Sequence, residues 1–85
     1  MKKIELYSTQ TCGFCRAAKS LLDDKGISYK EIDISSDPEL RGKMETKANG
    51  SRTVPQVFIN DAHLGGFSDL YALLQSGTLD KLLRD

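Results

Sequence analysis

Eighty-five residues are enough for one small domain and too few for two, so we expect a single domain over residues 1–85. Twelve basic and twelve acidic side chains cancel, with no run of either sign, which excludes the basic face that binds nucleic acid or a membrane surface. No stretch is apolar enough for a signal peptide or a membrane span, so we expect a cytoplasmic protein that acts on a small molecule or another protein.

The first third of the chain predicts a strand and then a helix. Apolar and polar side chains alternate from Lys3 to Tyr7, which is the period of a strand, and the polar residues 8–11 predict a loop. From Cys12 onward the apolar residues fall at helical spacing, and Gly26 is a typical helix end. These apolar residues are Phe14, Ala17, Ala18, Leu21 and Leu22.

The middle of the chain predicts a second strand and a second helix. Residues 27–34 are rich in β-branched and aromatic side chains, which favours a strand. Asp37 followed by Pro38 is typical of a helix start, and Asn49 with Gly50 is typical of the turn that ends one. The helix between them, residues 38–48, carries a glycine in its interior and a narrow apolar stripe, so we expect it to be the least stable helix.

The last third predicts two strands and a helix. Residues 57–59 form a continuous apolar run, typical of a buried strand, and a turn at residues 60–61 leads into a brief segment around His63 and Leu64. After the break at residues 65–66, Ser68 is a candidate cap for a helix that ends at Gly77. Residues 78–83 predict a last helical turn or two.

The resulting order is β-α-β-α-β-β-α, which places the chain in the α/β class. The β-α-β crossovers imply parallel strands, and the β-β step implies an antiparallel hairpin. We therefore expect one mixed, four-stranded sheet with helices on both faces.

The only two cysteines, Cys12 and Cys15, form a CxxC motif at the junction of the first strand and helix. The unpaired N–H groups and the positive dipole end of a helix N-terminus favour an anion, so Cys12 is the predicted nucleophile in its thiolate form. Cys15 lies inside the first turn beside Ala18 and Leu22. We expect it to be buried, less acidic and suited to resolve a disulfide formed on Cys12.

Other roles for the CxxC motif are less favoured. A structural zinc site needs four ligands, and beyond the cysteines the chain offers one histidine, His63. A permanent structural disulfide does not suit the reducing compartment that we expect. Arg16, four residues after Cys12, is either a cation that approaches the thiolate or a solvated surface arginine.

Three stretches in the same order and spacing, "YSTQTCGFC", "TVPQVFIN" and "GGFSDL", resemble the glutaredoxin family over nearly the whole chain. The resemblance implies a thioredoxin-like fold in which the Val54-Pro55 bond is cis. It also implies a glutathione-dependent thiol-disulfide oxidoreductase that uses glutathione as co-substrate. Its partners would be glutathionylated proteins and proteins with disulfide bonds, and both kinds of disulfide would be reduced.

The same resemblance implies a set of glutathione-binding residues. The cis-proline turn would pair with the glutathione backbone, the start of the last helix would bind its γ-glutamyl end, and a basic residue of the second helix would bind its glycyl carboxylate. By position in this sequence these residues are Phe14, Arg41, Thr53, Val54, Pro55, Gly66, Ser68 and Asp69. Many family members carry a lysine where this chain has Thr9, and Gln10 is a weak substitute for it.

The residue after the nucleophile is the second departure from the family pattern. Dithiol members usually have proline and tyrosine where this chain has Gly13 and Phe14, the pair seen in monothiol relatives. Glycine adds an N–H donor and loosens the turn. In the family, the members found to hold a [2Fe-2S] cluster between two subunits are ones that lack this proline. The cluster ligands in them are the thiolates equivalent to Cys12 and two glutathiones. The resemblance therefore implies an alternative function as a cluster carrier, monomeric when empty and dimeric when loaded.

Overall fold

The computed structural model describes residues 2–84 and contains one four-stranded sheet with the strand order β2-β1-β3-β4. The strands are β1 (Ile4–Ser8), β2 (Lys30–Asp33), β3 (Gln56–Ile59) and β4 (Ala62–Gly65). The helices are α1 (Gly13–Asp24), α2 (Pro38–Lys47), α3 (Phe67–Ser76) and α4 (Thr78–Arg84). None of the helices in residues 2–84 is long and apolar enough to span a membrane. The predicted element order and the mixed sheet are confirmed.

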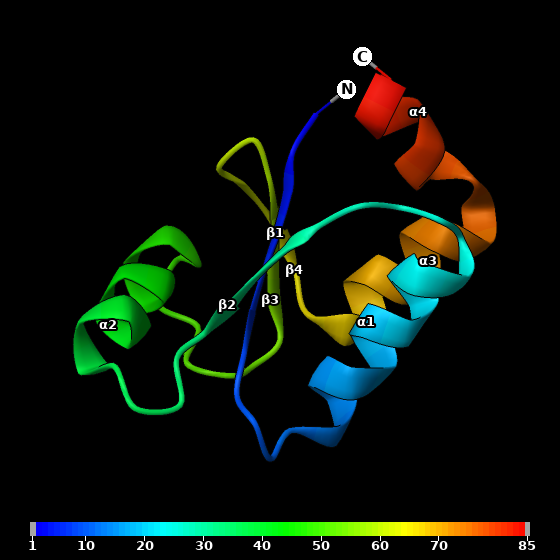
Figure 1. Cartoon of the computed structure of the whole chain (residues 1–85). Coiled ribbons are helices and arrows are strands. Elements are labelled where there is room, and N and C mark those ends of the chain that lie inside the picture. Colours follow the sequence, from blue (N-terminus) through cyan, green and yellow to red (C-terminus); the bar gives the residue numbers. More distant parts are fainter. Residues whose placement is uncertain (1, 85) are drawn as a thin grey trace.

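The strand directions confirm two of the predicted connections and correct one. β2 runs parallel to β1, as the first crossover predicts, and β3 and β4 form the antiparallel hairpin. The second crossover prediction was wrong, because β3 runs antiparallel to β1 and therefore also to β2. Asn49 and Gly50, which both have positive φ, turn the chain after α2. Residues 51–55 then lead it back to the end of the sheet at which β2 finishes (Figure 1). β3 thus enters the sheet from the end that β2 leaves.

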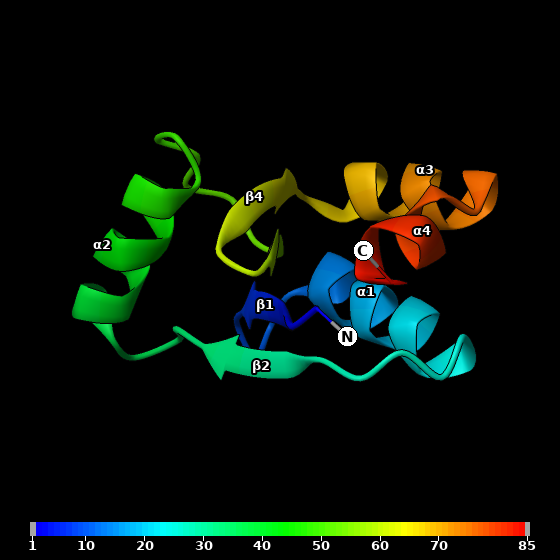
Figure 2. The ribbon, with the colours of Figure 1, turned by 90° about the horizontal axis from the view of Figure 1, so that it is seen from above.

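The helices cover both faces of the sheet, as predicted. α1, α3 and α4 lie on one face and α2 lies on the other, which is plain when the ribbon is seen from above (Figure 2). The larger core fills the face of α1, α3 and α4 and includes Leu6, Leu22, Val57, Leu70 and Leu79, all with no exposed area. A smaller core lies under α2 and contains Tyr7, Ile34, Met44, Ala48 and Phe58.

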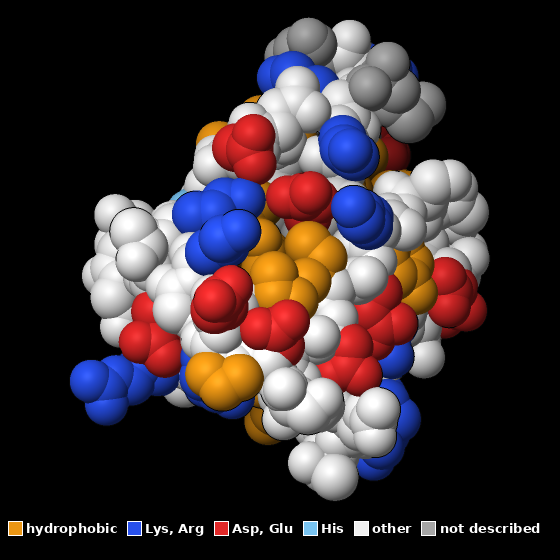
Figure 3. All heavy atoms as spheres, turned by 60° about the vertical axis from the view of Figure 1, so that its left-hand side comes forward, with side chains coloured by type: hydrophobic (Ala, Val, Ile, Leu, Met, Phe, Trp, Pro, Cys, Tyr) orange, Lys and Arg blue, Asp and Glu red, His pale blue; other side chains and the backbone are white. Residues whose placement is uncertain are grey.

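Lys47 at the end of α2 joins that helix to the sheet. Its ammonium lies 2.9 Å from the Asp61 carboxylate and 3.5 Å from Glu5, and 4.7 Å from the centre of the Phe58 ring. The hydrogen bond to Asp61 raises the pKa of Lys47 above its ordinary value. On the face that Figure 3 brings forward, acidic and basic side chains are interspersed around a small hydrophobic area.

Several element boundaries differ from the prediction, most of them by one residue, and three of the differences have a clear physical reason or matter for the site. Ser8 belongs to β1 and not to the following loop, because its hydroxyl donates a hydrogen bond to Glu31 at 2.7 Å and so keeps a partner while buried. β2 is shorter than residues 27–34, since the Ile27 N–H bonds back to the Leu22 carbonyl and closes α1. Ser68 is not the cap of α3. Gly66 occupies that position.

Candidate active site

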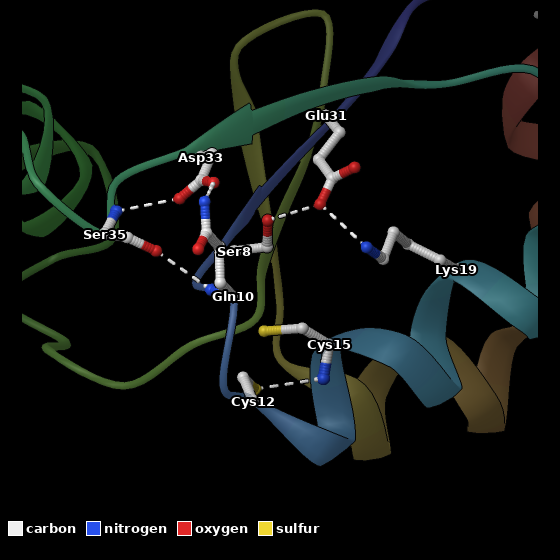
Figure 4. Close-up of polar contacts among 8 residues, drawn as sticks. All are labelled: Ser8, Gln10, Cys12, Cys15, Lys19, Glu31, Asp33 and Ser35. Carbon is white, nitrogen blue, oxygen red and sulfur yellow. Dashed lines mark hydrogen bonds and ion pairs between the residues drawn. The ribbon is translucent and has the colours of Figure 1, made fainter.

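Cys12 is the N-cap of α1 and keeps an extended backbone, with φ −95° and ψ 112°. The Cys15 backbone N–H donates to the Cys12 sulfur at 3.0 Å, so one of the orphan donors of the helix start is directed at this atom (Figure 4). The sulfur also lies 3.6 Å from the Val54 carbonyl oxygen, to which its thiol donates. Cys12 is partly exposed and makes no disulfide. The expected position at the start of the helix is confirmed.

Cys15 has no exposed area, although it is three residues away on the same helix. Burial, followed by the hydrogen bond with Cys12, raises the pKa of the Cys15 thiol to about 12. The expectation that Cys15 is the more buried thiol is confirmed. One helical turn thus separates an accessible sulfur with a backbone donor from a sulfur enclosed by the core.

A cavity of about 350 Å³ opens beside the Val54 carbonyl. Its size is within the range of small-molecule sites. Seven of the eight predicted ligand-binding residues line it, and they come from α1, the cis-proline turn and the start of α3: Phe14, Thr53, Val54, Pro55, Gly66, Ser68 and Asp69. Cys12 is not part of the lining, but its sulfur is next to Val54. The structure therefore brings the three sequence motifs to one place.

The turn before β3 is fixed by side chains that the sequence analysis missed. The Val54-Pro55 bond is cis, as the family resemblance implied. The Gln56 amide donates to the Thr53 carbonyl oxygen at 3.0 Å and to Thr53 Oγ1 at 3.1 Å. His63 Nε2 lies 2.6 Å from Gln56 Oε1, an acceptor, so this nitrogen carries the proton. The signal available in the sequence was a glutamine directly before an apolar strand.

The start of α3 is held by Asp69, its third residue. The Asp69 carboxylate accepts a hydrogen bond from the Gly66 N–H at 3.0 Å. Gly65 has φ +133°, and a Cβ at this position would overlap the Asp69 carboxylate, so only glycine fits here. Asp69 therefore caps the helix at the edge of the cavity, while the N–H groups of the first turn stay available to an anion.

Arg41, Gln10 and Arg16 lie outside the cavity. The Arg41 guanidinium donates to the Arg52 carbonyl oxygen at 3.1 Å, so it is bound to the segment that leads to Thr53 and does not line the cavity. The Gln10 amide donates to the Asp33 carboxylate at 3.2 Å and points toward the end of β2 (Figure 4). Arg16 is exposed, which agrees with a solvated surface arginine.

An aromatic strip begins at Phe14, two residues after Cys12 in the sequence, and continues along α3. Phe14, with 66% of its area exposed, lies 5.5 Å from the Phe67 ring, and Phe67 lies 6.0 Å from the ring of Tyr71. This strip is an apolar margin between α1 and α3. In residues 2–84 no group of three or more His, Cys, Asp and Glu side chains lies close enough to hold a metal ion.

Comparison with known proteins assigns the chain to a family. The glutaredoxin family model matches residues 4–64. A probable glutaredoxin of Synechocystis is 49% identical over 81 residues, which is 95% of this chain and 92% of the relative. The solution structure of a glutaredoxin from Brucella melitensis is 46% identical, covers 98% of this chain and 89% of its own, and superposes with a TM-score of 0.84.

A third similar protein was solved with a ligand. The buckwheat glutaredoxin-glutathione complex is 28% identical to this chain, with a TM-score of 0.86, and the match covers 98% of this chain and 77% of the other. Sequence, fold and the CxxC pair agree. The chain belongs to the glutaredoxin family and is a thiol oxidoreductase with a thioredoxin-like fold.

Proposed function

We propose that this protein is a cytoplasmic, glutathione-dependent oxidoreductase that reduces glutathione mixed disulfides and protein disulfides. The observation that carries the proposal is the position of the Cys12 sulfur. The sulfur accepts a hydrogen bond from the Cys15 N–H at 3.0 Å. It also lies 3.6 Å from the carbonyl oxygen of Val54, a residue that lines the cavity. A charge-assisted N–H bond stabilises the thiolate, and the thiolate is the attacking species.

In the first step the Cys12 thiolate attacks the glutathione sulfur of a mixed disulfide. The bond between the two substrate sulfurs breaks, the substrate leaves as a thiolate that takes a proton from water, and Cys12 becomes glutathionylated. A second glutathione, as thiolate, attacks the glutathione sulfur on Cys12. This step releases oxidised glutathione and regenerates the Cys12 thiolate.

The cavity offers complementary groups to an extended γ-glutamyl tripeptide. The Val54 backbone can pair with its peptide bonds as an added strand would. The free N–H groups at the start of α3, around Ser68, suit the γ-glutamyl carboxylate, and the Asp69 oxygen that does not bond Gly66 suits the ammonium. Arg41 has to give up its bond to the Arg52 carbonyl to reach the glycyl carboxylate, so we assign it a secondary role.

Protein disulfides use both cysteines in this proposal. Cys12 forms the mixed disulfide with the substrate, and Cys15 resolves it by forming the Cys12-Cys15 disulfide, which glutathione then reduces. The two sulfurs belong to one helical turn, so resolution needs no movement of a separate element.

A glutathione-coupled reductase assay on two serine variants tests the proposal. Cys12→Ser should abolish turnover of both a glutathionylated peptide and a protein disulfide, because it removes the nucleophile. Cys15→Ser should leave the glutathionylated peptide as a good substrate. A dead Cys15→Ser variant together with an active Cys12→Ser variant would refute the assignment of the two thiols.

The binding groups need a separate experiment, with kcat and KM for glutathione measured on an isosteric variant. Asp69→Asn keeps an oxygen that can accept from the Gly66 N–H but removes the charge that suits an ammonium. We expect KM for glutathione to rise at least about tenfold, because hydrogen bonds to charged groups contribute roughly 1.5 to 3 kcal/mol and a tenfold change corresponds to about 1.4 kcal/mol. Asp80→Asn in the first turn of α4 is the matched control. An unchanged KM for Asp69→Asn would remove this residue from the site.

A second candidate function is the binding of a [2Fe-2S] cluster as cargo. Nothing lies within 4 Å of a Cβ built on Gly13, so the space beside Cys12 is open to a second subunit. Residues 2–84 of one copy offer no cluster of three ligands, so the cluster would have to be shared with a second copy and with glutathione. Anaerobic reconstitution with iron, sulfide and glutathione tests this by visible absorption and size-exclusion mass. A colourless monomer would rule it out.

A further inference from the structure

A chain of hydrogen bonds joins the β3-β4 hairpin to the cis-proline turn. The Gln56 amide donates to the Thr53 carbonyl oxygen at 3.0 Å and to Thr53 Oγ1 at 3.1 Å. On its other side, Gln56 Oε1 lies 2.6 Å from His63 Nε2. Gln56 begins β3 and His63 lies in β4, so this one amide connects the turn with both strands of the hairpin. Both residues also line the cavity beside Val54.

The chemistry of the Gln56 amide fixes the direction of each bond. A backbone carbonyl only accepts, so the Gln56 atom that faces the Thr53 carbonyl is the amide nitrogen. The amide oxygen then faces His63, and because this oxygen also only accepts, His63 Nε2 is the donor. Gln56 is only 3% exposed, so water has little access to take the place of His63. His63 therefore keeps the amide in its orientation.

The His63 ring is itself seated on the core of the α2 face. It lies opposite Phe58 in the β3-β4 pair, and the centres of the two rings are 5.2 Å apart with their planes at 35°. Phe58 has no exposed area. A ring packed on a buried ring has few other positions, so Nε2 stays directed at Gln56.

The Gln56 amide controls the peptide unit between Thr53 and Val54. This peptide is trans, and in a trans unit the C=O and the N–H point in opposite directions. Because the Thr53 C=O is bonded to Gln56, the Val54 N–H is directed away from Gln56. This N–H is one of the backbone groups that the proposed function offers to the extended glutathione chain.

We propose that His63, acting through Gln56, is a positioning residue that orients the Val54 N–H for glutathione and so sets the affinity of the cavity for it. The inference rests on the proposed function, in which glutathione pairs with Val54. Without the His63 donor, the buried Gln56 oxygen has no partner, and the amide leaves its present orientation to find one. The Thr53-Val54 peptide then loses its fixed direction, and the apparent affinity falls with the fraction of molecules that keep the binding arrangement.

Three substitutions of His63 separate its donor from its packing. His63→Phe keeps a ring on Phe58 and removes the donor. His63→Gln and His63→Asn both carry an amide N–H, but the amide nitrogen of glutamine takes the position of Nε2, whereas that of asparagine takes the position of Nδ1, which is not the nitrogen that bonds Gln56. Ala62→Ser, at the exposed neighbouring position of β4, is the matched control.

The first measurement is kcat and KM for glutathione with a glutathionylated peptide as substrate. One hydrogen bond changes an equilibrium about fivefold, so His63→Phe and His63→Asn should raise KM about fivefold. Their kcat should stay within about twofold, because saturating glutathione restores the binding arrangement. His63→Gln and Ala62→Ser should keep both constants within about twofold. A role of His63 in folding alone would instead reduce the active fraction, and therefore kcat, at an unchanged KM.

The second measurement uses nuclear magnetic resonance of the free protein and needs no glutathione. His63→Phe and His63→Asn should shift the Val54 amide resonance and speed the exchange of the Gln56 side-chain protons, and His63→Gln should do neither. An unchanged Val54 resonance, or an unchanged KM in both His63→Phe and His63→Asn, would overturn the inference and leave the proposed function intact. A wild-type rate that does not saturate with glutathione would refute the proposed function and the inference together.

Discussion

Gly13→Pro should stabilise the protein without loss of reductase activity. Gly13 is the first residue of α1, where proline is tolerated because the N–H has no acceptor inside the helix. The preceding residue, Cys12, has φ −95° and ψ 112°, close to the extended conformation that a residue before proline prefers. Nothing lies within 4 Å of a Cβ at Gly13, so the ring enters open space.

The size of the stabilisation comes from the unfolded chain. Restricting a glycine whose native conformation suits the new residue adds about 0.4 to 1 kcal/mol to the free energy of unfolding. For a domain of this size that raises Tm by about 2 to 8 °C. The donor to the Cys12 sulfur is the Cys15 N–H, which the substitution leaves in place. Thermal unfolding by circular dichroism and the glutathione-coupled assay measure the two effects.

Gly26→Ala is the matched control for the conformational argument. A Cβ at Gly26 also meets nothing within 4 Å, but Gly26 has φ +67°, so alanine is strained there and should destabilise the protein by about 1 kcal/mol. Gly13→Ala should instead be neutral or stabilising. A lower Tm for Gly13→Pro, or a loss of activity of more than about tenfold, would show that the glycine conformation at the nucleophile is required for catalysis.

Three other substitutions test the packing and the charges. Gly65→Ala should lower the free energy of unfolding in urea by more than about 1 kcal/mol, because φ is +133° and the methyl group would displace Asp69. Met44→Ala should cost about 2 to 5 kcal/mol in the same assay, since Met44 is fully buried under α2. The hydrogen bond from Lys19 lowers the pKa of Glu31 below the ordinary value of 4.5 for a glutamate. The ionised Glu31 therefore stabilises the folded protein above pH 4.5, and this stabilisation is lost as the pH falls through the lower pKa of the folded state. Glu31→Gln should therefore lose less stability than the wild type on acidification below that pH.

The element order was predictable because each element carries a local signal, either a periodic pattern or the residues that begin and end it. Alternation in β1, helical spacing in α1 and the continuous apolar run in β3 act over a few residues and need no tertiary information. The direction of β3, in contrast, is not determined by such a local pattern. It depends on the turn at Asn49 and Gly50 and on where residues 51–55 re-enter the sheet, which the strand pattern does not encode.

The candidate site was predictable where a motif holds the residues together in sequence. The CxxC pair, the turn at Val54 and Pro55 and the start of α3 are each continuous. The contacts between Gln56 and His63, or between Lys19 and Glu31, join residues that each look like ordinary polar positions of their own elements. These residues come together only through the register of the strands and the packing of α1 on the sheet.

The hydrogen bond that the Cys12 sulfur accepts inside α1 comes from the backbone of residue 15. The donor at 3.0 Å is the Cys15 N–H, which any residue but proline supplies. Cys15→Ser keeps this N–H and should therefore leave the rate of alkylation of Cys12 by iodoacetamide at neutral pH unchanged within about twofold. A tenfold slower reaction would mean that the buried sulfur itself tunes the nucleophile. An unchanged rate would show that the helix start alone makes the nucleophile, so that this chain can use Cys12 by itself for glutathione mixed disulfides and needs Cys15 only to resolve protein disulfides.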